Sequence, residues 1–131
     1  MIGLDTNVLL RFLLKDDERQ GEQASRAIRQ AAARKEPMFV GIIVLCEVVW
    51  VLTSRYGYGR SRLLGLLEEL LDTSGLEVER RDLVRKALDD YRASRADFAD
   101  CLIGRIHEAH GCQHTLSFER PLKALDTFRV L

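Results

Sequence analysis

Five acidic side chains lie at positions where the ends of strands could gather them, and they are the candidate catalytic or metal-binding residues. They are Asp5, Glu47, Asp97, Asp100 and Glu119. Two carboxylates about 5 Å apart repel by roughly 3 kcal/mol at an effective dielectric near 20. If these side chains converge, their pocket must therefore take up protons, recruit a basic side chain or bind a cation. A set of oxygen ligands without histidine or cysteine suits Mg²⁺ or Mn²⁺ better than Zn²⁺.

The stretch around Asp5 places the first of these carboxylates. Residues 2–10 read as a buried strand, a polar turn at Asp5, Thr6 and Asn7, and then a helix. Ligands of open parallel α/β sheets bind beyond the carboxyl ends of the strands, so Asp5 is a candidate active-site residue. The alternative is that Asp5 or Thr6 only caps the helix. The stretch alone leaves both interpretations open.

Strands and helices alternate along the rest of the chain. Strands are predicted over 2–4, 38–40, 76–79, 115–118 and 127–131, and helices over 8–14, 20–34, 44–54, 62–71, 82–95 and 96–110. This alternation predicts one α/β domain over residues 1–131, a three-layer α/β/α sandwich with a mainly parallel central sheet. The last of these helices carries Asp97 and Asp100 in its first turn, on one face.

Two helices are less obvious from composition. Residues 41–52 are rich in β-branched side chains, which favour a strand, but the run is long and places Val44, Glu47 and Val51 on one side of a helix. The next helix is predicted to start at a Ser61 cap. Trp50 and the leucines after Ser61 are predicted to belong to the core rather than to a ligand platform.

Composition excludes few functions. The chain has 131 residues, with 20 basic and 20 acidic side chains, so bulk charge identifies no partner. Nucleic-acid binding depends on local patches. The apolar run 38–52 is interrupted at Cys46 and Glu47 and is too short to span a bilayer. The early strand predicts that no targeting segment precedes the fold. Three cysteines without a C-x-x-C pair predict reduced thiols in a cytoplasmic protein.

Four segments of the chain form a recognisable set, which in chain order is LDTNVLLR at 4–11, VLCEVVWVL at 44–52, ADFADCLI at 96–103 and LSFER at 116–120. Together they resemble the PIN domain, and within it the VapC-type toxin ribonucleases of toxin–antitoxin pairs. The resemblance implies an endoribonuclease that depends on Mg²⁺ or Mn²⁺. It also implies an RNA substrate, a homodimer and a cognate antitoxin.

The resemblance assigns the acidic residues to roles. Asp5, Glu47 and Asp100 match the acidic metal-site positions of the family. Asp97 matches a further acidic position of this subgroup, and Asn7 the small polar residue that orients the pocket. Thr6 lies between two of these residues and is expected to support them.

Two residues near the end depart from the family pattern. Ser117 stands where the family usually has threonine, and Glu119 where it usually has aspartate. The extra methylene of Glu119 lengthens the arm by about 1.5 Å. Mg²⁺ requires near-ideal geometry and readily keeps its waters. Glu119 is therefore predicted to support the site rather than to ligate the ion.

Other clusters have competing interpretations. His107, His110, Cys112 and His114 lie close together in sequence, as zinc ligands do, but their spacing matches no strong zinc pattern. Histidine near a helix C-terminus is also favourable for its interaction with the helix dipole. Basic residues such as Arg11 and Lys15 are candidates for an RNA-facing rim, or are scattered solvated charge.

The leading hypothesis is a cytoplasmic endoribonuclease toxin. A second is a PIN-like nuclease of RNA maturation or DNA repair. A third is a non-catalytic α/β regulatory module that binds Mg²⁺. Asp5 at a strand end fits that module, whereas Glu47 and the Asp97–Asp100 pair fit it poorly.

Overall fold

The computed structural model describes residues 1–14 and 18–131, and these form two compact units, Met1–Glu79 and Arg80–Leu131. Lys15, predicted to face RNA, and Asp16 and Asp17, candidate helix caps, lie outside the described residues.

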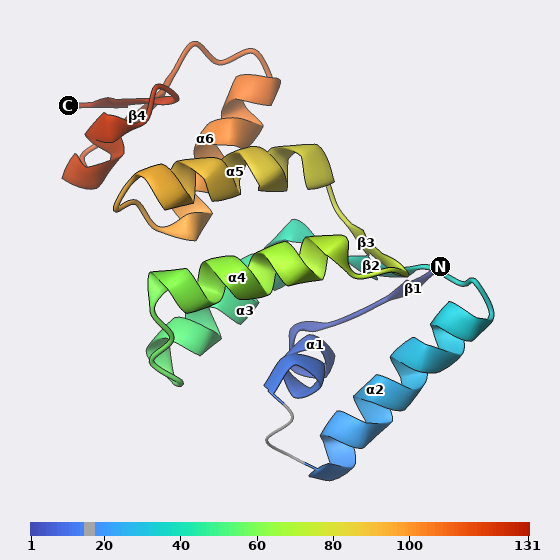
Figure 1. The fold of residues 1–131 in the computed structure, drawn as a ribbon. Coiled ribbons are helices and arrows are strands. Elements are labelled where there is room, and N and C mark those ends of the chain that lie inside the picture. Colours follow the sequence, from blue (N-terminus) through green and yellow to red (C-terminus); the bar gives the residue numbers. More distant parts are fainter. Residues whose placement is uncertain (15–17) are drawn as a thin grey trace. The chain divides into compact units, whose positions relative to one another are not determined.

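The first unit is a small parallel sheet with four helices (Figure 1). Its elements are β1 (Ile2–Gly3), α1 (Thr6–Leu14), α2 (Glu18–Ala33), β2 (Met38–Val40), α3 (Ile42–Ser54), α4 (Arg60–Asp72) and β3 (Leu76–Val78). The strand order is β1-β2-β3, with Met38 opposite both Ile2 and Leu76. Because all three strands run in the same direction, the residues that follow them gather along one edge of the sheet.

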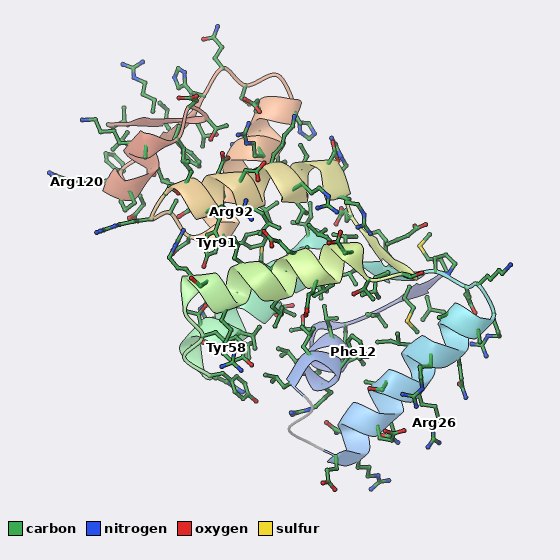
Figure 2. All side chains as sticks on the ribbon, in the orientation of Figure 1. Phe12, Arg26, Tyr58, Tyr91, Arg92 and Arg120 are labelled. Carbon is green, nitrogen blue, oxygen red and sulfur yellow. The ribbon has the colours of Figure 1, made fainter. Side chains whose placement is uncertain are left out.

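The core of the first unit is formed largely by the buried faces of its helices. On α3 the buried residues are Leu45, Val48 and Leu52, spaced three and four apart as a single helix face requires. Helix α1 contacts both α2 and α3, and α4 contacts β3. The turn between α3 and α4 holds Tyr58 (Figure 2), with the Arg62 guanidinium 3.8 Å from the centre of its ring.

The second unit pairs two helices and a two-stranded parallel sheet. Its elements are α5 (Arg81–Ala93), α6 (Phe98–Ala109), β4 (Thr115–Ser117), the 3₁₀ helix η1 (Arg120–Ala124) and β5 (Phe128–Val130). Arg105 ties α6 to α5 by donating from Nε to Asp90 Oδ2 at 2.7 Å and from Nη2 to Asp90 Oδ1 at 2.8 Å. Tyr91 on α5 (Figure 2) meets Phe98 edge to face, with ring centroids 6.1 Å apart.

The α/β class with parallel strands is confirmed, and the strands pair as a three-stranded and a two-stranded sheet. The helix predicted against strand propensity is also confirmed, as α3. None of the described helices is long and apolar enough to cross a membrane.

Two local predictions in the first unit are wrong. Ser61 is not a helix cap, because α4 begins at Arg60 after the extended Gly59, whose carbonyl accepts the Leu63 N–H at 3.1 Å. Trp50 is not a core residue: 65% of it is exposed, because the buried stripe of α3 lies on the other side of the helix. The leucines of α4 do belong to the core, and the buried ones are Leu63, Leu67, Leu70 and Leu71.

Candidate active site

Asp5 follows β1 and caps α1. Its Oδ1 accepts the backbone N–H of Val8 at 2.9 Å, and its carbonyl accepts that of Leu9 at 3.2 Å. An N-cap carboxylate satisfies one of the orphan amides of the first turn and its charge favours the positive end of the helix dipole. The cap uses a single carboxylate oxygen. Within the described chain Oδ2 accepts no hydrogen bond, so capping leaves the carboxylate with an oxygen for a ligand.

Thr6 connects the turn after β1 to α3. Its hydroxyl donates to Oε1 of Glu47 at 2.9 Å, between residues 41 apart in sequence. Glu47 is exposed, near the middle of α3. Since Thr6 directly follows Asp5, this bond holds the Glu47 carboxylate beside the end of the first strand. The first unit thus brings together two of the predicted acidic residues and a hydroxyl that orients one of them.

Glu79 is a supporting residue that the sequence did not reveal. The strand was expected to include it, but β3 ends at Val78, and Glu79 Oε1 accepts the backbone N–H of Ile42 at 2.8 Å. Its own N–H donates to the Val40 carbonyl at 2.9 Å. Glu79 therefore caps the start of α3, the helix that carries Glu47. The signal in the sequence was a glutamate directly after a strand, on the sheet edge where a helix begins.

Asp97 and Asp100 do not share the first turn of a helix as predicted. Asp97 is the extended residue before α6, with φ −69° and ψ 150°, and its carbonyl accepts the Cys101 N–H at 3.1 Å. Asp100 lies in the first turn. The bounds differ because the backbone of Asp97 is extended, so that Asp97 takes the N-cap position, and its side chain makes no capping hydrogen bond within the described chain.

Asp100 carries the electrostatic signature of a carboxylate cluster. Burial raises its pKa above the ordinary value, and the negative charges of Asp97 and then Glu119 raise it further. Each of these causes disfavours the ionised form, and none is a basic side chain. The second unit thus brings three acidic groups near one another. Such a group gains from a proton or a cation.

Ser117 and Glu119 form the turn after β4. The Glu119 N–H donates to Ser117 Oγ at 3.0 Å, and the Glu119 carbonyl accepts the Leu122 N–H at 3.1 Å as η1 begins. Ser117 therefore fixes the backbone of Glu119. The Glu119 side chain is exposed and acts on Asp100 through its charge.

The oxygen-rich character of these residues fits Mg²⁺ or Mn²⁺. Over residues 1–14 and 18–131, neither unit by itself has three or more His, Cys, Asp or Glu side chains arranged to hold an ion. Carboxylates without a counterion repel, so a loose arrangement is the expected one.

In the histidine cluster, His107 Nδ1 pairs with Thr115 Oγ1 at 2.9 Å and His110 Nδ1 with the Ile106 carbonyl at 2.9 Å.

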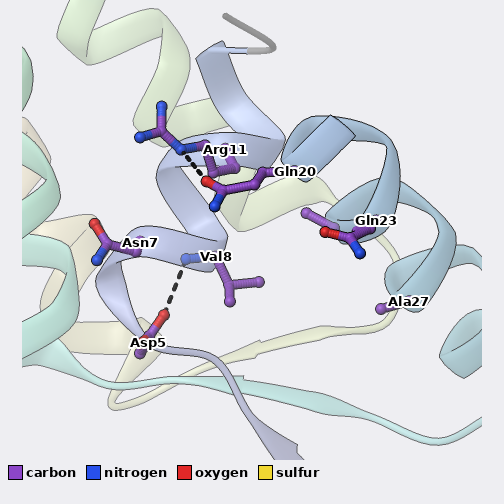
Figure 3. Close-up of a pocket in the computed structure, with 8 residues that line it drawn as sticks. Asp5, Asn7, Val8, Arg11, Gln20, Gln23 and Ala27 are labelled. Carbon is purple, nitrogen blue, oxygen red and sulfur yellow. Dashed lines mark hydrogen bonds between the residues drawn. The ribbon is translucent and has the colours of Figure 1, made fainter. Parts of the chain in front are cut away.

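A pocket of about 330 Å³ opens beside Asp5, between α1 and α2 (Figure 3). Its lining residues are Asp5, Asn7, Val8, Arg11, Gln20, Gln23, Ala24 and Ala27. Arg11, predicted to face RNA, donates from Nε to Gln20 Oε1 at 2.8 Å. Asn7, predicted to orient the site, is part of the same wall.

Comparison with known proteins identifies the family to which this chain belongs. The model of the PIN domain matches residues 2–127. The chain belongs to the PIN domain family. A VapC ribonuclease of Aquifex aeolicus (strain VF5) is 30% identical over 122 residues, which cover 93% of this chain and 90% of that protein. The PIN match runs through both compact units, and the family predicted from the four sequence segments is confirmed.

Proposed function

We propose that this PIN domain protein is a divalent-metal-dependent endoribonuclease and the toxin of a toxin–antitoxin pair. The observation that carries the proposal is the group of Asp97, Asp100 and Glu119, in which burial and then the negative charges of the other two residues raise the pKa of Asp100. Such a group is suited to a cation, and it lies in a chain similar to a VapC ribonuclease.

We propose further that the two units are parts of one nuclease domain and that their carboxylates serve one reaction. The support is the PIN match, which spans residues 2–127. Asp5, Glu47 and Asp100 would hold Mg²⁺ or Mn²⁺, with Asp97 assisting. Glu119 would support the site without binding the ion directly. When bound, the ion supplies an activated water and stabilises the charge that develops on the phosphate.

The chain's own residues have distinct tasks in this proposal. Thr6 orients Glu47 through the 2.9 Å hydrogen bond. Glu79 fixes the start of α3 and so the position from which Glu47 extends. Ser117 fixes the backbone of Glu119. Arg11 borders the pocket beside Asp5, where a basic group offsets the repulsion between acidic side chains and RNA phosphates.

We also propose a homodimer, a cognate antitoxin and a cytoplasmic location. The dimer is supported by Ile43 and Trp50 on α3, which are 77% and 65% exposed and lie on the helix face that carries Glu47. Exposed apolar side chains that share a face mark interaction surfaces. Trp50→Glu should shift the protein to monomers in sedimentation velocity, and a wild-type protein that is monomeric at high concentration would refute the dimer.

The test of the nuclease uses purified protein, structured RNAs and Mg²⁺ or Mn²⁺, with the product ends mapped. Asp5→Asn should abolish cleavage with little loss of stability, because asparagine caps a helix as well as aspartate does. Asp126→Asn, at an exposed aspartate that is not one of the candidate carboxylates, is the matched control and should cleave normally. Undiminished cleavage in excess EDTA, or by Asp5→Asn, would rule out the proposed mechanism.

A further inference from the structure

Phe118 is an aromatic residue of the second unit that lies directly after β4 and is 81% exposed. Single exposed apolar side chains are common on protein surfaces, so exposure alone assigns no role. The position of this one is more informative, because open α/β sheets bind their ligands beyond the carboxyl ends of parallel strands. The next residue is Glu119, whose charge acts on Asp100. The ring therefore borders the candidate carboxylate group.

The backbone is fixed on both sides of the ring. The Ser117 carbonyl accepts the Leu131 N–H at 2.8 Å, and Ser117 Oγ accepts the Glu119 N–H at 3.0 Å. The Glu119 carbonyl accepts the Leu122 N–H at 3.1 Å. A ring on a fixed backbone has only its side-chain torsions left to order, so a ligand that binds it loses little affinity to conformational entropy.

The burial pattern shows to which side the ring projects. Thr115 and Ser117 are half-buried, whereas Leu116 and Phe118 are exposed, as the alternation of side chains along a strand requires. The ring thus leaves the chain on the side opposite to Ser117, while the Cα of Glu119 is about 3.8 Å from that of Phe118. A group that lies on the ring is next to the carboxylates rather than among them.

Arg120 supplies a cation two residues after Phe118. It is exposed at the start of η1, at the surface of the second unit (Figure 2). Its side chain has no hydrogen bond or ion pair with the rest of the described chain. An aromatic face beside such a guanidinium suits a nucleotide, because the face packs on a base and the guanidinium binds a phosphate. The guanidinium therefore favours RNA over an apolar protein partner at this surface.

We propose that Phe118 stacks on one base of single-stranded RNA beside the cleaved bond and that Arg120 binds an adjacent phosphate. The proposal rests on the nuclease function proposed above. Stacking on an aromatic side chain tolerates any base, because every base has a π face. This contact therefore positions the RNA without selecting its sequence.

The test of stacking measures the Kd of a short single-stranded RNA, intact and with an abasic residue at one position at a time. Fluorescence anisotropy in EDTA gives these values where metal-dependent cleavage cannot occur. Wild-type protein should lose about fivefold to a hundredfold in affinity at one abasic position, and Phe118→Leu should lose as much on intact RNA. Phe118→Leu should be insensitive to that abasic position, and Phe118→Trp should bind like wild type.

The matched control for the ring is Leu116→Ala, at an apolar residue of the same strand that is 58% exposed, and it should keep the wild-type Kd. For the phosphate contact, Arg120→Gln should reduce the slope of log Kd against log salt concentration by about 0.7, the value for one contact to a single strand. Lys86→Gln, at an exposed residue of α5, should leave the slope unchanged.

These measurements separate the inference from the nuclease itself. Binding that is sensitive to one abasic position and loses this sensitivity in Phe118→Leu supports the stacking, even if no RNA is cleaved and the nuclease proposal fails. If wild type cleaves RNA while neither the abasic residues nor Phe118→Leu change the Kd, the nuclease stands and the stacking is refuted. A Phe118→Leu protein that binds RNA normally but no longer dimerises in sedimentation velocity would assign the ring to a protein interface instead.

Discussion

The hydroxyl of Thr6 and the carboxylate of Glu47 are joined by a 2.9 Å hydrogen bond that connects the turn after β1 to the middle of α3. A carboxylate held in this way keeps one orientation, and its second oxygen can face a ligand without the entropy cost of ordering the side chain. Thr6 is thus a positioning residue for Glu47.

Thr6→Val should lower metal-dependent cleavage by about tenfold to a hundredfold, the range found when a supporting partner of a metal ligand is removed. The β-branched shape is kept, so the loss comes from the hydroxyl. Thr6→Ser restores a hydroxyl and should recover most of the activity, with the apparent metal affinity moving in parallel. Thr53→Val removes a hydroxyl that binds the Val49 carbonyl on the same α3 helix and serves as the control. Equal activity of Thr6→Val and wild type would exclude the positioning role.

Divalent metal should stabilise the protein. A ligand at ten times its Kd adds about 1.4 kcal/mol to the free energy of unfolding, which corresponds to a rise in Tm of about 2–6 °C. Asp100→Asn should remove most of this rise, and Asp126→Asn should keep it. A Tm that stays constant through a Mg²⁺ and Mn²⁺ titration to tens of millimolar would argue against the site.

Without metal, the same substitution should act in the opposite direction. The pKa of Asp100 is raised in the folded state, so the folded protein binds its proton more tightly than the unfolded chain does. The contribution of Asp100 to stability therefore falls as the pH rises from below its ordinary pKa through the raised value. In EDTA, Asp100→Asn should have a higher Tm than wild type at neutral pH, and this gap should close in acid. Thermal unfolding across a pH series measures it. A gap that widens toward low pH would contradict the assignment.

Helix α6 approaches β5 closely at Gly104. A Cβ there would lie 2.5 Å from Thr127 Oγ1 and 2.6 Å from Phe128 Cε2. Gly104→Ala should therefore destabilise the protein by about 1–3 kcal/mol, the usual cost of overpacking a core. Gly65→Ala, in α4 with nothing within 4 Å of the added carbon, should stabilise it by about 0.5–1 kcal/mol. Chemical denaturation distinguishes the two, and a neutral Gly104→Ala would show that α6 can move away from β5.

Glu119 should prove less important than Asp5. Its backbone is fixed by Ser117, while its exposed side chain acts on Asp100 through charge. Glu119→Gln should lower cleavage by about tenfold to a hundredfold, whereas Asp5→Asn should abolish it. The two variants are compared on one RNA at saturating Mn²⁺. A Glu119→Gln protein as inactive as Asp5→Asn would indicate a direct ligand.

The helices and strands could be predicted from the sequence where they depend on hydrophobic periodicity and on the identity of turn residues. The length of the apolar run and the spacing of Val44, Glu47 and Val51 predicted a helix over 44–54 despite its β-branched content. In the structure the buried stripe of this helix is Leu45, Val48 and Leu52. The sequence did not reveal Trp50 as exposed, since hydrophobicity alone does not tell which side of a helix faces the core. The roles of Thr6 and Glu79 depend on bonds to residues 41 and 37 positions away. No local pattern encodes such pairs.

The bond from Ile42 to Glu79 sets a limit on how the chain can be shortened. The last residue of the first unit caps a helix that starts 37 positions earlier. A fragment that stops just before this residue would keep the whole Asp5–Thr6–Glu47 arrangement in its sequence. Its α3 would nevertheless begin with an unsatisfied first turn and fray at that end. Any dissection of this protein by limited proteolysis or by expression of shorter fragments should therefore place its boundary beyond Glu79.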